Sequence, residues 1–170
     1  MANNEFIESE MRFVFDEEQV LLLEKQSFFA RMQDVRACDF VSLQKRKPGS
    51  RLLFIEAKSS APKQSDPLEQ YLQEIYEKFW HSLLLYIGVL YDRFGTGPVD
   101  MPKDISNKNN LRRKITCVLV VRRHKREWLP LLQEALRRKI KPLKNAFGLQ
   151  DVFVTNEAGA AKHQLVRSRQ

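Results

Sequence analysis

Apolar residues recur at helical spacing through the middle of the chain, and this pattern constrains the fold more than any other feature. It begins at Asp66-Pro67, where an aspartate suits the helix cap and a proline suits the first helical position. The apolar positions that follow are Leu68, Leu72, Ile75, Phe79, Leu83, Ile87, Leu90 and Phe94. We therefore expect a long helix to about residue 94, ended by Gly95 and followed by a flexible polar loop over residues 100–110.

Strand patterns lie on both sides of this helix. Residues 35–43 alternate, residues 51–58 (RLLFIEAK) are mostly apolar, and a Pro-Gly turn separates the two segments. Such a short connection predicts an antiparallel hairpin. Beyond the helix, the β-branched run 115–121 (ITCVLVV) predicts a strand that is covered on both faces.

The C-terminal third adds a helix and a strand. Residues 127–146 carry a second apolar helical stripe, which Pro142 is expected to end or bend, and residues 151–155 (DVFVT) predict a last strand. Residues 157–170 are polar and basic, so we expect a frayed tail.

The N-terminal segment EFIESEMRFVF indicates a strand, and Asp16 a cap for a short helix through Leu23. A chain of 170 residues suits a single domain. The order of these elements predicts an α/β fold, with a central mixed β-sheet flanked by helices.

The composition favours an anionic partner. Lys and Arg number 29 against 21 Asp and Glu, for a formal charge of +8, so nucleic acid is the first partner to consider. Cys38 and Cys117 lie in apolar runs without the spacing of a zinc site or a disulfide framework. No signal peptide is expected at the N-terminus, and the longest apolar run, residues 83–91, is too short to span a bilayer, so we expect a cytoplasmic chain without membrane contact.

Charged residues interrupt the strand patterns at one place. Glu56 and Lys58 are two apart in a strand and therefore share a face, at a separation of roughly 6 to 7 Å. The expected hairpin brings Asp39 beside them. Two carboxylates with a lysine suit Mg²⁺ or Mn²⁺, with the lysine available to a reacting water.

The arrangement of Asp39, a hairpin turn, Glu56-Ala57-Lys58 and a long helix resembles the PD-(D/E)xK nuclease superfamily, which has the restriction-endonuclease-like fold. The resemblance covers about residues 30–123, and Cys38 stands where the family's proline would be. It implies metal ligation by Asp39, Glu56 and the backbone of Ala57, with Lys58 assisting the attacking water. It also implies a further glutamate from an N-terminal helix, for which Glu24 is our candidate, with Glu17, Glu18 and Glu10 as alternatives.

Basic and hydroxyl side chains supply candidate contacts to nucleic acid. They lie at the hairpin tip, just after the expected site, and after the strand 115–121. The candidates are Lys45, Arg46, Lys47, Ser59, Ser60, Lys63, Arg122, Arg123, Lys125 and Arg126.

The leading hypothesis is thus a metal-dependent nuclease, with DNA favoured over RNA as substrate. Three alternatives remain open: a catalytically silent nuclease-fold module that binds nucleic acid or protein, an RNA nuclease or branched-DNA resolvase, and a structural ion-pair network at Asp39, Glu56 and Lys58. The aromatic-rich helix also suits a homodimer face. The lack of a sequence-reading motif leaves room for a partner protein that delivers the target.

Overall fold

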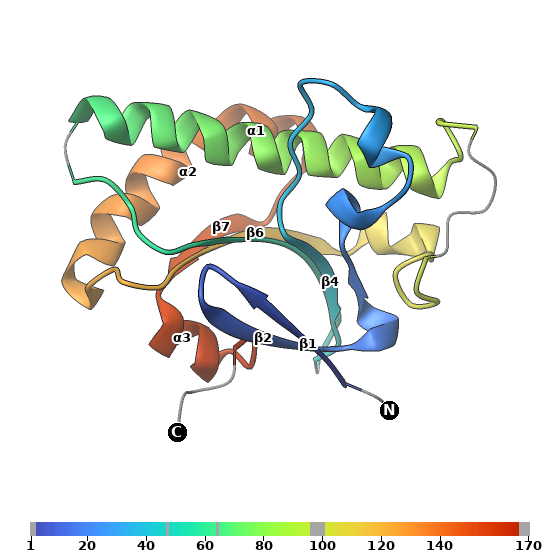
Figure 1. Ribbon diagram of the computed structural model, residues 1–170, viewed down its shortest axis with the longest axis horizontal. Coiled ribbons are helices and arrows are strands. Elements are labelled where there is room, and N and C mark those ends of the chain that lie inside the picture. Colours follow the sequence, from blue (N-terminus) through green and yellow to red (C-terminus); the bar gives the residue numbers. More distant parts are fainter. Residues whose placement is uncertain (1–2, 47, 64, 96–100, 167–170) are drawn as a thin grey trace.

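A mixed five-stranded sheet lies at the centre of the computed structural model, which describes residues 3–46, 48–63, 65–95 and 101–166 (Figure 1). Its strands follow the order β3-β4-β5-β6-β7, antiparallel from β3 to β5 and parallel from β5 to β7. They are β3 (Val20–Leu21), β4 (Phe40–Gln44), β5 (Arg51–Lys58), β6 (Lys114–Val121) and β7 (Asp151–Thr155). The predicted α/β class, the mixed sheet and the antiparallel β4-β5 hairpin are confirmed.

Two long helices cover one face of the sheet, α1 (Ser65–Leu90) and α2 (Leu129–Phe147) (Figure 1). Each connects two parallel strands, which need a crossover of this length. Their apolar side chains pack on alternate residues of the central strands, such as Leu52 and Phe54 of β5. Glu56 and Lys58 continue this alternation, so they point toward α1.

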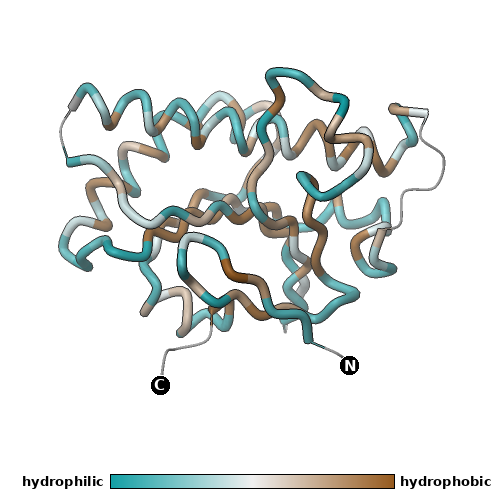
Figure 2. The backbone as a smooth tube through the Cα atoms, in the orientation of Figure 1, coloured by the Kyte–Doolittle hydropathy of each residue, from teal (hydrophilic) through white to brown (hydrophobic). Residues whose placement is uncertain are grey.

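A smaller layer covers the other face. The hairpin of β1 (Asn3–Glu8) and β2 (Met11–Asp16) packs there with α3 (Glu157–Lys162) against Leu53, Ile55 and Ala57 of β5. Figure 2 accordingly places apolar stretches along the central sheet, with hydrophilic segments mainly at the periphery.

The N-terminal part is more irregular than the sequence indicates. Asp16 accepts a hydrogen bond from the amide of Glu18, but the turn it caps is only η1 (Glu17–Gln19), and the chain then enters β3. Two more short 3₁₀ turns follow, η2 (Leu23–Lys25) and η3 (Phe29–Arg31).

The expected strand over residues 35–43 is wrong in its first half. The amides of Arg36 and Cys38 donate to the side chains of His81 and Ser82 on α1, at 3.1 and 2.8 Å. Because α1 takes these donors, regular pairing begins only at Phe40.

The end of α1 and the following loop also differ from expectation. Asp92 adopts a left-handed conformation (φ 49°), so the helix ends before Phe94. In the described part of the loop, Ile105 and Asn110 are buried, and the hydroxyl of Tyr86 donates to the carbonyl of Ile105 at 2.7 Å. The loop is therefore anchored on α1 through Ile105, and its last residues belong to η4 (Lys108–Arg112), which corrects the expectation of a flexible loop over its described residues.

The C-terminal part differs from expectation at two points: Pro142 does not end α2, and the first part of the expected tail is ordered. After η5 (Arg126–Trp128), helix α2 continues through Pro142 to Phe147 and ends at Gly148 with φ 64°. Within the expected frayed tail, residues 157–162 instead form α3, and beyond it Leu165 and Val166 are buried against the β1-β2 hairpin. Residues 167–170 of that tail lie outside the described residues. The amide of Val14 donates to the carbonyl of Leu165, which ties this segment down.

Candidate metal and phosphodiester site

Glu56 and Lys58 lie at the carboxyl end of the central strand β5. Glu56 is only 1% exposed, Lys58 is 24% exposed, and the Lys58 Nζ lies 3.5 Å from the Glu56 Oε1. Strand alternation places both on one face, as expected from the sequence. The position is internal to the sheet, since β4 and β6 flank β5, so these charges do not belong to a sheet edge.

Asp39 reaches the same place from the neighbouring strand. It directly precedes β4, where Phe40 pairs with Ile55. The Asp39 Oδ2 accepts a hydrogen bond of 2.7 Å from the amide of Ala57, between Glu56 and Lys58. The three residues singled out in the sequence are therefore brought together.

Helix α1 adds Glu74 and Lys78, two residues that the sequence analysis missed. The Lys78 Nζ lies 2.7 Å from the Glu56 Oε1, and the Lys58 Nζ lies 2.8 Å from the Glu74 Oε1. Glu74 and Lys78 are four apart and share a helix face. This spacing, next to the apolar stripe of α1 that faces β5, is the sequence feature that could have indicated Glu74 and Lys78.

Burial dominates the protonation of the carboxylates. Burial and then the charge of Asp39 raise the pKa of Glu56, Lys78 and Lys58 oppose them, and the net result is a pKa of about 7. Burial also raises the pKa of Asp39, although the Ala57 amide opposes this. Burial lowers the pKa of Lys78, but Glu56 outweighs it by charge and hydrogen bonding, so the net shift is upward.

One oxygen of this cluster has no partner among the described residues. The Glu56 Oε2 is buried and accepts no hydrogen bond, whereas Oε1 is held by Lys78. A buried carboxylate oxygen without a hydrogen bond or a bound cation destabilises the folded state, so this oxygen is a candidate ligand atom. Beside the Asp39 carboxylate, an oxygen of this kind fits a hard cation such as Mg²⁺ or Mn²⁺.

Other glutamates influence the site through their charge. Glu24 lies on η2 and raises the pKa of Asp39, while burial first and then Asp39 raise the pKa of Glu8 on β1. Glu8 was also missed, because only the hairpin fold brings β1 near β5. Within the described ranges, no group of three or more His, Cys, Asp or Glu residues is placed to hold a metal ion.

The alternatives to Glu24 have other roles or positions. Glu10 forms ion pairs with Arg122 and Arg123, and Glu18 accepts a hydrogen bond from the Lys103 amide. Glu17 lies on η1, at the periphery.

The carbonyl of Ala57, a candidate ligand, already accepts a hydrogen bond of 3.0 Å from the Ser9 hydroxyl. Ser9 and Glu10 form the tight turn of the β1-β2 hairpin with φ values of 49° and 60°, the geometry that two-residue hairpins require. A carbonyl oxygen has two lone pairs, so a second contact remains open to it.

Most of the predicted nucleic-acid contacts lie at the same end of the sheet as Glu56 and Lys58. The amides of Arg122 and Arg123 donate to the carbonyls of Lys58 and Ser59, which fixes the segment after β6 beside the end of β5. Ser59, Ser60, Lys63, Lys125 and Arg126 are exposed around it. Arg122 and Arg123 are partly neutralised by Glu10.

Trp128 forms an aromatic platform in this basic region. The ammonium groups of Lys63 and Lys125 lie 3.8 and 5.0 Å from the centre of its ring. Trp128 is half-buried, and these contacts are cation–π interactions. Proteins that bind single-stranded nucleic acid combine a basic groove with aromatic side chains on which bases stack.

The tip of the β4-β5 hairpin lies away from the basic region around Lys58. Gln44 pairs with Arg51, so Lys45 and Arg46 stand at the opposite end of β5 from Lys58, about 23 Å away along the strand. Lys45 pairs with Asp104, and Arg46 donates to the carbonyl of His163. Lys47 lies outside the described residues.

Comparison of the chain with protein-family models, curated proteins and solved structures finds no significant match. Among the described helices, none combines the length and apolar character that crossing a membrane requires.

Proposed function

We propose that the chain is a metal-dependent nuclease that hydrolyses phosphodiester bonds, with DNA as its expected substrate. One observation carries the proposal. The Asp39 and Glu56 carboxylates and the Lys58 ammonium converge at the end of β5, and a buried Glu56 oxygen there has no described partner.

The order of elements gives further support. The chain runs from an antiparallel hairpin with Asp39 and Glu56, through the long helix α1, to the parallel strand β6. This order agrees with the resemblance to PD-(D/E)xK nucleases. The basic end of β5 and β6 offers phosphate contacts beside the site.

Asp39, Glu56 and the carbonyl of Ala57 would hold Mg²⁺ or Mn²⁺, which would polarise the scissile phosphate and make water more acidic. Lys58 would stabilise the charge that develops as water attacks in line. Glu74 would position Lys58 through their 2.8 Å ion pair. Lys78 would balance the charge of Glu56 whenever the cation is absent.

One observation favours a second function, a silent nuclease-fold module that binds nucleic acid or protein. Lys78 already neutralises Glu56, as in a structural ion-pair network. In a silent module, binding would depend on neither the metal nor Lys58. A homodimer and a targeting partner are compatible with both proposals.

The test is cutting of supercoiled plasmid, linear duplex, single-stranded DNA and RNA in Mg²⁺, Mn²⁺ or EDTA, by wild type and Lys58→Met. The matched control is Lys114→Met, an exposed lysine at the amino end of β6, which lies beside Arg51 at the opposite end of β5 from Lys58. The nuclease proposal expects cutting that EDTA and Lys58→Met abolish and the control retains. Absence of cutting on every substrate, with all variants folded, would favour the silent module.

A further inference from the structure

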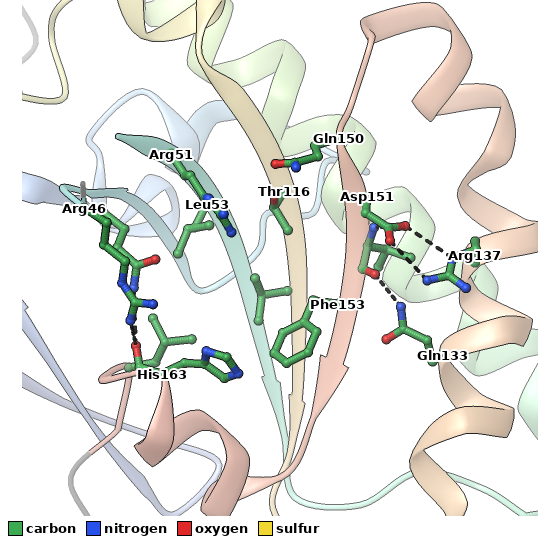
Figure 3. A pocket seen from close by; sticks show the side chains of 14 residues that line it. Arg46, Arg51, Leu53, Thr116, Gln133, Arg137, Gln150, Asp151, Phe153 and His163 are labelled. Carbon is green, nitrogen blue, oxygen red and sulfur yellow. Dashed lines mark hydrogen bonds and ion pairs between the residues drawn. The ribbon is translucent and has the colours of Figure 1, made fainter. Parts of the chain in front are cut away.

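A pocket of about 630 Å³ lies on the sheet face opposite α1. It is at the amino ends of β5 and β6, so both the face and the strand end differ from those of Glu56. Its labelled walls come from β5, β7, α2 and the segment after α3 (Figure 3). A volume of this size lies within the range of small-molecule sites.

The pocket has an excess of positive charge. Its lining contains Arg46, Arg51 and Arg137 against one carboxylate, that of Asp151. Arg137 pairs with Asp151 at 3.1 Å, so this acid is already neutralised. Arginine on two sides of a hollow favours an anionic ligand, because guanidinium groups match phosphate and carboxylate oxygens.

Arg51 is the residue that most directly indicates a ligand. Arg46 donates to the carbonyl of His163 at 2.8 Å, but the side chain of Arg51 has no hydrogen bond or ion pair with any described residue. Figure 3 places it along the pocket, above Leu53 and beside Thr116. A guanidinium in this position is free to bind an anion without breaking an internal contact.

The floor of the pocket is apolar and includes an aromatic ring. Leu53, Val118 and Phe153 project from three adjacent strands on this face. The ring of Phe153 meets that of His163 edge to face, with 5.0 Å between their centres. A flat ring can lie on such a floor, while Thr116 and Gln150 offer polar groups to its edge.

We propose that this pocket binds a nucleotide, with the phosphate at Arg51 and the base on the floor that contains Phe153. A nucleotide combines the two properties that the walls and the floor select, an anionic group and a flat ring with a polar edge. The site does not depend on the proposed nuclease activity, because it shares no residue with the cluster at Asp39, Glu56 and Lys58.

The experiment is calorimetric titration of the full chain with the four nucleoside monophosphates, in EDTA so that no metal takes part. Ribose 5-phosphate and the free nucleosides serve as partial ligands. The variants are Arg51→Glu and Phe153→Leu. Arg31→Glu is the matched control, since Arg31 is an exposed arginine on η3, whose neighbours pack on the α1 face.

We expect saturable binding of at least one nucleotide, weakened at least tenfold by Arg51→Glu and unchanged by Arg31→Glu. Binding should also weaken in Phe153→Leu and for either partial ligand. Thermal unfolding checks each variant, and Arg51→Ala replaces any Arg51→Glu protein that does not fold. Absence of binding, or equal affinity of the Arg51 variant, would overturn the site. Equal affinity for ribose 5-phosphate would overturn the assignment of a nucleotide.

Discussion

The Glu56 carboxylate lies 2.7 Å from the Lys78 ammonium at a point where the Glu56 side chain is only 1% exposed. Each charge thus compensates the other in a region with little water. Removal of one partner leaves a buried unpaired charge, whereas removal of both can be nearly neutral. This asymmetry makes the pair testable.

Lys78→Met should lower the free energy of unfolding by about 2 kcal/mol at pH 8, because the buried Glu56 would keep only its longer, 3.5 Å ion pair with Lys58. The double variant Glu56→Gln with Lys78→Met should recover most of this loss. Urea unfolding of the two variants measures both values. A single variant as stable as wild type would mean that the ion pair contributes little to the fold.

The raised pKa of Glu56 predicts a pH dependence of stability. Burial and Asp39 raise this pKa to about 7, so the folded state binds the proton more tightly than the unfolded chain does. The stabilisation is complete below the unfolded value of about 4.3 and is lost as the pH rises through about 7. Between pH 5 and pH 8, wild type should lose about 2 kcal/mol relative to Glu56→Gln. Parallel stability curves for the two proteins would contradict the shift.

Replacement of Asp39 by alanine and by asparagine should affect the stability of the protein differently. Asp39→Ala leaves the buried amide of Ala57 without its acceptor and should cost about 1 to 3 kcal/mol. Asp39→Asn keeps an oxygen for that amide and should stay close to wild type in stability. It removes a metal ligand, however, so millimolar Mn²⁺ should raise the melting temperature of wild type and not that of Asp39→Asn. Equal stabilisation of both proteins by Mn²⁺ would remove Asp39 from the metal site.

The basic end of β5 and β6 should dominate the binding of nucleic acid. Lys63→Ala and Lys125→Ala should each weaken binding of a labelled DNA and lower the slope of log affinity against log salt by about 0.9 per phosphate contact. Lys45→Ala, at the other end of β5, serves as the matched control. Fluorescence anisotropy at several salt concentrations provides the slopes. An effect of Lys45 as large as that of Lys63 would place the nucleic acid elsewhere.

Local periodicity made much of the fold predictable. The strands at 51–58 and 151–155 match β5 and β7, and the long helix was recognised from its apolar stripe and its Asp-Pro start. The misses came from contacts between distant segments. Residues 35–39 do not form the expected strand because the amides of Arg36 and Cys38 donate hydrogen bonds to side chains of α1. Residues 157–166 are ordered by packing against the β1-β2 hairpin.

The same distinction applies to the site. Glu56 and Lys58 share a face by strand alternation, and a short hairpin brings Asp39 near them, so local reasoning was sufficient. Lys78 is separated from Glu56 by 22 residues, and its part in the cluster depends on how α1 lies across β5. The pocket at Arg51 combines one face of three adjacent strands with a helix and the C-terminal segment, which no local pattern reveals.

The most direct test of the central claim separates cutting from binding in Glu56→Gln. This variant keeps the side-chain shape and a hydrogen-bond acceptor for Lys78, and removes the charge that would hold the metal. Cleavage in Mn²⁺ and DNA affinity in EDTA are measured on the same preparations. The nuclease account predicts metal-dependent cutting by wild type that falls at least a hundredfold in Glu56→Gln, with affinity within about threefold. Cutting retained by Glu56→Gln, or absent from wild type while both bind DNA equally, would contradict it.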